Sequence, residues 1–389
     1  MKTYYIGDDN RERKLQHILK DRYLHIAVDR QEYTVNWKSR YDRRFTILLG
    51  IASVDNISGY HLGSHLNYDS NVIAEDIEKL ADELGDNDKP HYLRRYAQYW
   101  LSTDYERAAK KAFAKRKTPW PEPDELDSEL NQPVRGLQVR PEYVMLAHFL
   151  FLRKLLKESK VDFSLDQEAG IERAFFYGFS DMVTAGKCHA MLVAIKKGLG
   201  NDHRVGLVGS GQKLLEEYRE SREELINEDD TEVKRQFIKE VIKLGSSSKY
   251  ITNDGFVHNP FHRVTEPYKK SKLITSHIPI SDGRKAALHL FASLHAVDSV
   301  FNLNRRCISL LERPKSSESN AGRSWSGYQA YSPSMVVKML DIQRTFYNFI
   351  KVSDIDQKTP AMRIGLAKGP VTFEKVLYFN PFEEGRGVK

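Results

Sequence analysis

Cysteine is scarce in this chain of 389 residues, which contains only Cys188 and Cys307. Two cysteines exclude a disulfide framework and a zinc site of the paired-cysteine kind. We therefore expect an intracellular protein in a reducing compartment. Long apolar runs are missing as well, since no segment approaches the ~20 apolar residues of a membrane span and residues 1–13 are polar. These absences predict a cytoplasmic protein without a membrane partner.

A surplus of acidic residues is also absent. Lysine and arginine number 60, and aspartate and glutamate number 53, so the formal net charge is +7. A basic balance favours polyanionic partners such as nucleic acid, although many basic proteins bind none. The length of 389 residues allows either one large domain with insertions or two domains.

Three β-type runs open the pattern, at residues 23–37, 43–54 and 58–68. The segments between these runs are short and rich in turn-forming residues, which predicts an antiparallel meander. Apolar residues at helical spacing then predict a helix over 70–84 that ends at Gly85. The chain therefore begins with three strands and a helix.

Two more strands alternate with helices farther along the chain. The pattern predicts a helix at 141–157, a strand at 160–165 that ends at Asp166, a helix at 171–185 and a strand at 187–196. Parallel strands need crossover connections of this length, and a helix is the usual one. These elements are therefore expected to extend the meander on one side.

Polar segments interrupt this order and predict insertions. Residues 86–139 are polar with clustered prolines, and residues 209–244 carry dense charges with leucines at helical spacing, which indicates a solvated helical hairpin. A long helix is expected from about 284 to 313, ended by Pro314, and a last helix at 334–350. The expected division is a core of 1–85 and 140–197, a polar insertion at 86–139, a helical insertion at 198–283, a catalytic helix, loop and C-terminal helix at 284–350, and a tail at 351–389.

Without the insertions, the order is three strands, a helix, a strand, a helix, a strand and a helix. This order matches the α/β RNase H-like fold, a mixed five-stranded sheet that begins with an antiparallel meander and is flanked by helices. Asp29 lies inside the first strand, Asp166 ends the fourth and Asp298 lies on the helix after the fifth. These are the positions where that fold brings carboxylates together.

Asp29 is the most informative residue because it places a carboxylate inside an otherwise apolar strand. An unpaired carboxylate costs several kcal/mol in water-poor surroundings, so such a residue usually faces a metal, a cation or a cleft. Asp166 and Asp298 have comparable apolar neighbours, and three converging carboxylates predict a bound divalent metal. The alternatives are an exposed Asp29 beside Arg30 and a helix N-cap at Asp166.

The chain also resembles the bacterial insertion-sequence transposases of the DDE/DDD type. The resemblance runs from about residue 22 to residue 379 and depends on the order of blocks that are weak singly. Its distinctive part is a third carboxylate with a basic residue seven positions later on one helical face, followed by a Tyr-Asn-Phe helix and a Thr-Pro-Ala segment. The blocks are Asp29 with 42–55 and 58–69, then 163–170, and then 297–306, 325–328, 347–349 and 358–363.

By this resemblance, Asp29, Asp166 and Asp298 are the catalytic triad and the metal ligands. Phosphodiester cleavage needs an activated nucleophile and a stabilised leaving oxygen, which two Mg²⁺ ions ~3.5–4 Å apart provide, with Mn²⁺ as a possible substitute. Mg²⁺ prefers carboxylate oxygens and retains waters, so one bridging aspartate and one flanking carboxylate for each ion are sufficient. No histidine or cysteine ligand is required.

The third carboxylate has an alternative, because the family commonly has glutamate there and Glu312 lies on the same expected helix as Asp298. The two residues would be ~21 Å apart along that helix at 1.5 Å per residue, so they cannot share a metal pair. Asp298 is favoured because Arg305 and Arg306 follow it as in the motif. In the alternative, Glu312 is the ligand and Asp298 pairs with an arginine.

Four further residues are candidates for DNA contact. Arg305 and Arg306 would hold DNA phosphates or pair with the nearby carboxylates, and Lys196 would meet the DNA backbone or remain a surface charge. Trp325, in a loop rich in glycine and serine, would stack on unpaired bases or anchor its loop to the core.

The resemblance implies a Mg²⁺-dependent transposase that hydrolyses double-stranded DNA at mobile-element ends and joins the freed 3′-hydroxyl to target DNA. Such enzymes act as homo-oligomers, here in the cytoplasm and on the nucleoid. About twenty residues precede the first strand, so a separate DNA-recognition polypeptide is expected to supply end binding. The alternatives are an inactive or truncated remnant that only binds DNA or other partners, and a structure-selective nuclease of the same fold.

Overall fold

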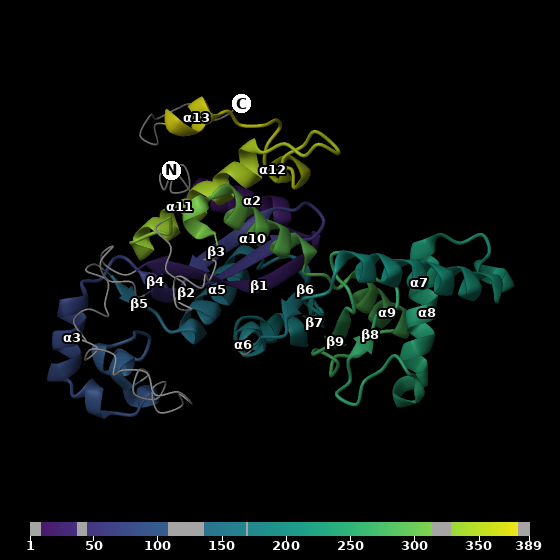
Figure 1. Ribbon diagram of the computed structural model, residues 1–389, viewed down its shortest axis with the longest axis horizontal. Helices are drawn as coiled ribbons and strands as arrows, with labels where there is room; N and C mark the ends of the chain where they lie inside the picture. The colour runs from purple at the N-terminus through teal and green to yellow at the C-terminus, as the bar shows by residue number, and fades with distance from the viewer. Residues whose placement is uncertain (1–8, 37–44, 108–135, 169, 313–327, 380–389) are drawn as a thin grey trace.

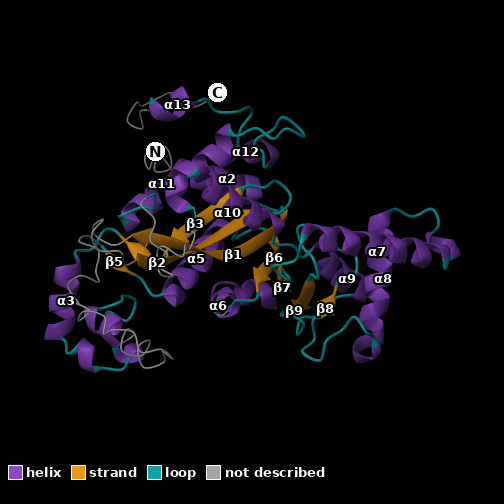
Figure 2. Ribbon diagram, viewed as in Figure 1, coloured by secondary structure: helices purple, strands orange, loops and turns teal. Residues whose placement is uncertain are grey.

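A seven-stranded mixed sheet forms the centre of the computed structural model, which describes residues 9–36, 45–107, 136–168, 170–312 and 328–379 (Figures 1 and 2). The strand order is β3-β2-β1-β6-β7-β9-β8. The pairs β1–β6 and β6–β7 are parallel, and the other four pairs are antiparallel. The strands are β1 (Tyr23–Asn36), β2 (Phe45–Asp55), β3 (His61–Leu66), β6 (Lys160–Asp166), β7 (Cys188–Ala194), β8 (Val257–His258) and β9 (Lys270–Leu273).

The expected meander of β1, β2 and β3 is present. β1 and β2 pair from Ile26↔Asp55 to Asn36↔Phe45. The turn between β2 and β3 is closed by Asp55, whose Oδ2 accepts hydrogen bonds from the Ser58 backbone N–H at 2.8 Å and the Ser58 hydroxyl at 2.6 Å. A carboxylate that binds the backbone ahead of it is the local reason why such segments turn. The loop at 37–44 lies outside the described residues.

The sheet is wider than the five strands expected from the sequence. β8 and β9 extend it at the β7 edge, and both come from the segment expected to be a helical insertion, 198–283. β9 reads Lys-Ser-Lys-Leu, which lacks the β-branched and aromatic residues of a strand. Its conformation comes from pairing with β7, from Met191↔Leu273 to Ala194↔Lys270. The five-strand expectation was therefore wrong because this strand has no local signal.

Helices cover both faces of the sheet. α5 (Pro141–Leu155) and α6 (Ile171–Thr184) pack on one face against a large apolar core, in which the rings of Phe149, Phe163 and Phe179 meet. α10 (His295–Cys307) covers the other face, where Val297, Val300 and Phe301 pack with Ala27. Residues alternate between these faces along each strand. Ala27 therefore marks the α10 face of β1, and Asp29, two residues later, lies on the same face.

The insertions lie at opposite ends of the sheet (Figure 1). At the β3–β2 end, α3 (Ala74–Glu83) begins four residues later than expected, and β4 (Tyr68–Asp69) pairs with β5 (Leu137–Gln138). At the β9–β8 end, α7 (Asn201–Glu220) and α8 (Asp230–Leu244) form the expected helical hairpin, which starts earlier than residue 209.

The long helix expected over 284–313 is instead two helices. α9 (Asp282–Phe291) ends before Ala292, and α10 begins at His295 after a three-residue break. A short 3-10 turn at Ser309–Leu311 then follows α10, so Glu312 is not on the helix that carries Asp298. The backbone groups freed at 292–294 are bonded by side chains distant in sequence, which is why local periodicity did not reveal the break.

The C-terminal part packs against β3. α11 (Pro333–Thr345) continues as a π-helical turn (Phe346–Ile350), in agreement with the last helix expected at 334–350. The buried Asn348 accepts from the backbone N–H of His61 and donates to its carbonyl, both at 2.9 Å. The remaining helices are α2 (Asp9–Leu19), α12 (Pro360–Arg363) and α13 (Phe373–Leu377). Among the described helices, none has the length and apolar character needed to cross a membrane.

Candidate metal centre

Asp29 and Asp166 are neighbours on adjacent parallel strands. The pairing of β1 with β6 runs to Val28↔Leu165, so the next residue of each strand is an aspartate. Asp29 is only 5% exposed, and its Oδ1 accepts a hydrogen bond of 2.6 Å from the backbone N–H of Arg30. Carboxylate oxygens of the two aspartates lie within 4.8 Å of each other. Two carboxylates this close share a proton unless a cation lies between them.

Asp298 lies on α10, the helix that covers the face of the sheet to which Asp29 belongs. It lies in the first turn of α10, next to Val297, which is buried against the sheet. Its negative charge contributes to the raised pKa of Asp29, and the charge of Asp166 contributes to the raised pKa of Asp298. The structure therefore places Asp29 and Asp166 side by side on β1 and β6, and Asp298 of α10 within electrostatic reach of both.

All three aspartates have pKa values above the usual range. Burial is the largest cause in each case. Repulsion adds to it, from Asp166 and Asp298 at Asp29, from Asp166 and Glu266 at Asp298, and from Glu168 at Asp166. Lys197, an exposed residue just beyond β7, lowers the pKa of each carboxyl group but does not offset burial. Carboxylates that repel one another in a partly buried site are the usual electrostatic signature of a functional position.

Glu168 is a fourth acidic residue at this centre, and the sequence had not singled it out. Carboxylate oxygens of Asp29, Asp166 and Glu168 all lie within 4.8 Å of one another, which makes this group able to hold a metal ion. Asp298 is not in that group and acts on it from farther away. The Asp-Gln-Glu spacing directly after a buried strand is the signal that could have identified Glu168.

Arg30 forms an ion pair with Glu168, between its Nε and a Glu168 carboxylate oxygen. Arg30 follows Asp29 on β1, so its side chain leaves the strand toward the opposite face. Glu168 thus has two electrostatic influences, the aspartates and the arginine. A cation bound by the aspartates would compete with Arg30 for this carboxylate.

The donor set fits a hard divalent cation. The group contains only carboxylate oxygens, which Mg²⁺ and Mn²⁺ prefer, and no histidine or cysteine, which zinc sites commonly contain. Burial raises the pKa values of the three aspartates in spite of the nearby Lys197, so each carboxyl group is held more readily with a proton than in water. A divalent cation would remove both the repulsion and the need for a shared proton.

The structure places the other candidate residues apart from this centre. Glu312 is exposed beyond the end of α10. Lys196 lies over the ring of Tyr268 at 5.3 Å from its centroid, so Lys197, not Lys196, acts on the aspartates. Arg305 bonds Asn302 at 2.6 Å and Arg306 is exposed, both in the last turn of α10. Trp325 lies outside the described residues.

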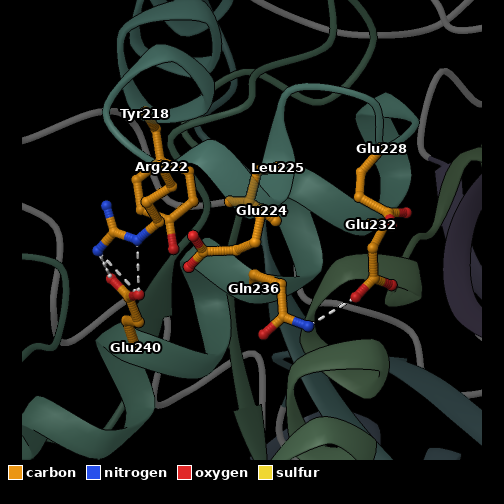
Figure 3. A pocket seen from close by; sticks show the side chains of 8 residues that line it. All are labelled: Tyr218, Arg222, Glu224, Leu225, Glu228, Glu232, Gln236 and Glu240. Carbon is orange, nitrogen blue, oxygen red and sulfur yellow. Dashed lines mark hydrogen bonds and ion pairs between the residues drawn. The ribbon is translucent and has the colours of Figure 1, made fainter.

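A second acidic cluster lies on the helical hairpin, around a pocket of about 260 Å³ (Figure 3). Glu240 accepts from Arg222 at 2.7 Å, and Glu232 pairs with Arg235 at 2.6 Å. These arginines neutralise two of the four glutamates that line the pocket, Glu224, Glu228, Glu232 and Glu240. The cluster therefore differs from the centre at Asp29, where burial and repulsion raise the pKa values in spite of the nearby Lys197.

Substitutions at Glu168 and Arg30 should change metal affinity in opposite directions. Glu168→Gln is expected to weaken Mn²⁺ binding by about 10- to 100-fold because a carboxylate at the centre is lost. Arg30→Gln should leave the affinity unchanged or raise it, because Glu168 is released and a positive charge is removed. Titration calorimetry of the metal-free protein measures both. A loss of affinity in both variants would show that the ion pair only supports the local fold.

Comparison of the chain with protein-family models finds no match. Comparisons with curated proteins and with solved structures find no match either. The functional argument therefore depends on the geometry of the centre.

Proposed function

We propose that this protein is a divalent-metal-dependent DNA transposase with an RNase H-like core. The observation that carries the proposal is the convergence of Asp29, Asp166 and Asp298 from two parallel strands and a covering helix, with a shared rise in pKa. Glu168 is a further candidate ligand. Mg²⁺ is the proposed ion, and Mn²⁺ is its proposed substitute.

The strand connections support the RNase H-like part of the proposal. Strands β3-β2-β1-β6-β7 have two antiparallel pairs followed by two parallel pairs, with α5 and α6 as crossovers on one face. This is the arrangement expected from the order of the sequence elements. β9 and β8 are then an extension by the insertion.

The chemistry follows from what the residues can bind. Bound divalent ions would act as Lewis acids that activate the attacking oxygen and stabilise the leaving oxygen. Asp29, Asp166 and Asp298 would hold these ions, with Glu168 as a further ligand. In hydrolysis, water attacks the phosphorus and the 3′-oxygen leaves; in strand transfer, that 3′-hydroxyl attacks a phosphate of target DNA and displaces the 3′-oxygen of the target strand.

Double-stranded DNA is the proposed partner, and a basic groove supports it. The groove has a volume of about 650 Å³ and lies between α2 and the end of α5. Gln16 of α2 donates to the carbonyl of Lys154 at 3.3 Å and thereby ties the two walls. Repeated cations are what the phosphate backbone attracts. Its basic side chains are Arg13, Lys20, Arg153, Lys154 and Lys157, with His17, and its acidic one is Glu158.

The proposal is tested by incubating the wild-type protein with supercoiled DNA in Mg²⁺, in Mn²⁺ and in EDTA. We expect nicking only with metal, and joining of an oligonucleotide bearing a free 3′-hydroxyl to the plasmid. DNA binding in EDTA should weaken steeply with salt, because phosphate contacts release counterions. A folded protein that binds DNA but never nicks it would instead be a remnant, and nicking without joining would indicate a nuclease.

A further inference from the structure

Two charged residues of the insertion at 198–283 form hydrogen bonds with the break between α9 and α10. Ala292, Ser293 and Leu294 are all buried, and they lie four to six residues before Asp298. These two residues, Glu266 and Lys269, come from the loop that leads into β9. The position of α10 over the sheet therefore depends on a segment outside the five-stranded core.

Glu266 accepts hydrogen bonds from two polar groups of the break. Its side chain is 1% exposed, and its Oε1 accepts hydrogen bonds from the Ser293 hydroxyl at 2.8 Å and from the Leu294 backbone N–H at 2.9 Å. The Ser293 hydroxyl in turn accepts from the backbone N–H of His295 at 3.2 Å. Glu266 thus supports the start of α10, where backbone N–H groups have no partner within the helix.

Lys269 holds the other end of the break. It is 5% exposed, and its Nζ donates to the carbonyl of Ala292 at 2.6 Å, while the Nζ to Glu266 Oε2 distance is 3.7 Å. Burial lowers the pKa of Lys269, although the carboxylate of Glu266 opposes this effect. A buried ion pair contributes little net stability after desolvation, whereas removing one partner leaves the other charge buried and uncompensated.

The core supplies only neutral contacts to the same break. Ser164 of β6 accepts from the Ser293 backbone N–H at 3.1 Å, and Asn56 donates to the Ser293 carbonyl at 3.0 Å. Within the described part of the chain, the charged contacts to the break are those of Glu266 and Lys269. The negative charge of Glu266 also contributes to the raised pKa of Asp298, so Glu266 is within electrostatic reach of the metal centre.

We propose that Glu266 and Lys269 are positioning residues that set the start of α10, and hence Asp298, against the two aspartates of the sheet. The insertion is then energetically coupled to the third carboxylate. This inference rests on the proposed function in taking Asp298 as a metal ligand, but the hydrogen bonds of Glu266 and Lys269 with the break do not depend on catalysis.

The test compares Glu266→Ala and Glu266→Gln with the control Glu223→Ala, an exposed glutamate of the same insertion. Amide hydrogen exchange of the peptide covering 292–300 is measured at a temperature where melting curves show each variant folded. Glu266→Ala should speed this exchange by about tenfold or more, because both hydrogen bonds are lost. Glu266→Gln keeps an oxygen acceptor for both bonds and should remain within about twofold of wild type.

Mn²⁺ titration supplies a readout that a purely structural role would not move. Glu266→Ala should weaken the Mn²⁺ site that depends on Asp298 by about tenfold, as loss of a supporting residue does, and leave the other site unchanged. The Asp298-dependent site is identified as the one lost in Asp298→Ala. Glu266→Gln should restore the affinity.

Unchanged exchange at 292–300 in Glu266→Ala, or equal losses in Glu266→Ala and Glu266→Gln, would overturn the proposal. If Asp298→Ala binds Mn²⁺ as wild type does, the ligand role of Asp298 is wrong, and the exchange data alone decide whether Glu266 positions the start of α10. If Glu266→Ala does not fold, Ser293→Ala removes one of the two donors, and a threefold or greater rise in exchange there is the supporting result.

Discussion

Asp29→Ala, Asp166→Ala and Asp298→Ala are each expected to lower Mg²⁺-dependent nicking of supercoiled DNA by about 10³-fold or more, because each removes charge that places a metal at the reacting phosphate. Asp29 should be the most sensitive position, since it is the most buried and its pKa is raised by both other aspartates. The measurement is the initial rate of nicking by each variant, after circular dichroism has shown that it is folded.

Glu312→Ala is the matched control for this series. Glu312 is exposed past the end of α10, so its loss should leave the nicking rate within about twofold of wild type. If Glu312→Ala abolishes nicking while Asp298→Ala retains it, the third ligand has been assigned to the wrong residue. If all four variants nick as the wild type does, the activity belongs to another site or to a contaminant.

Asp29→Asn is expected to stabilise the metal-free protein while removing its response to metal. In the folded state, burial and then repulsion by Asp166 raise the pKa of Asp29 well above its usual range. The ionised form is thus disfavoured by folding, and the neutral amide avoids that cost. At pH 7 in EDTA, we expect the free energy of unfolding to rise by about 1–3 kcal/mol, the usual cost of a buried group with unmet interactions.

The sign of the pH dependence follows from the direction of the shift. Below about pH 4, the usual aspartate pKa, the carboxyl group is neutral in both states and contributes nothing. As the pH rises toward the raised folded-state pKa, the unfolded chain loses its proton first, so the stability of the wild type falls. Melting curves in EDTA from pH 4 to pH 8 should therefore decline less for Asp29→Asn than for wild type.

Added metal should reverse the order of stability. Mn²⁺ at 100 times its Kd stabilises a folded protein by about 2.7 kcal/mol, so the wild type should melt higher with Mn²⁺ and Asp29→Asn should not respond. Asp88→Asn, at an exposed position, is the matched control and should behave as wild type. A wild type that shows no Mn²⁺ shift, or an Asp29→Asn that is less stable than wild type in EDTA, would contradict the site as described.

Parts of the fold followed directly from local patterns. The strands β1, β6 and β7 read as apolar runs, and α5 and α6 read as periodic helices, because buried elements have a period that a short window reveals. The α/β class and the expected meander are confirmed by the sheet. Asp29 was noticeable for the same reason, as a carboxylate inside an apolar run.

Other parts had no local signal. β9 is polar and becomes a strand only through its pairing with β7. The break at 292–294 interrupts a helical pattern because Glu266 and Lys269 bond its backbone from another segment. Glu168 follows β6 by two residues, and its carboxylate lies within 4.8 Å of those of Asp29 and Asp166 only in the folded chain.

The sequence by itself determined the strands and helices of the five-stranded core and which aspartates stand in apolar surroundings, because both depend on residues a few positions apart. Only the tertiary structure decided which acidic groups meet. Asp29 and Asp166 become neighbours through a parallel register across 136 intervening residues, and Asp298 joins them because α10 is packed on the same face and held there by the insertion. Burial and repulsion from neighbouring acidic groups, which raise the pKa values of all three, exist only once those segments are assembled.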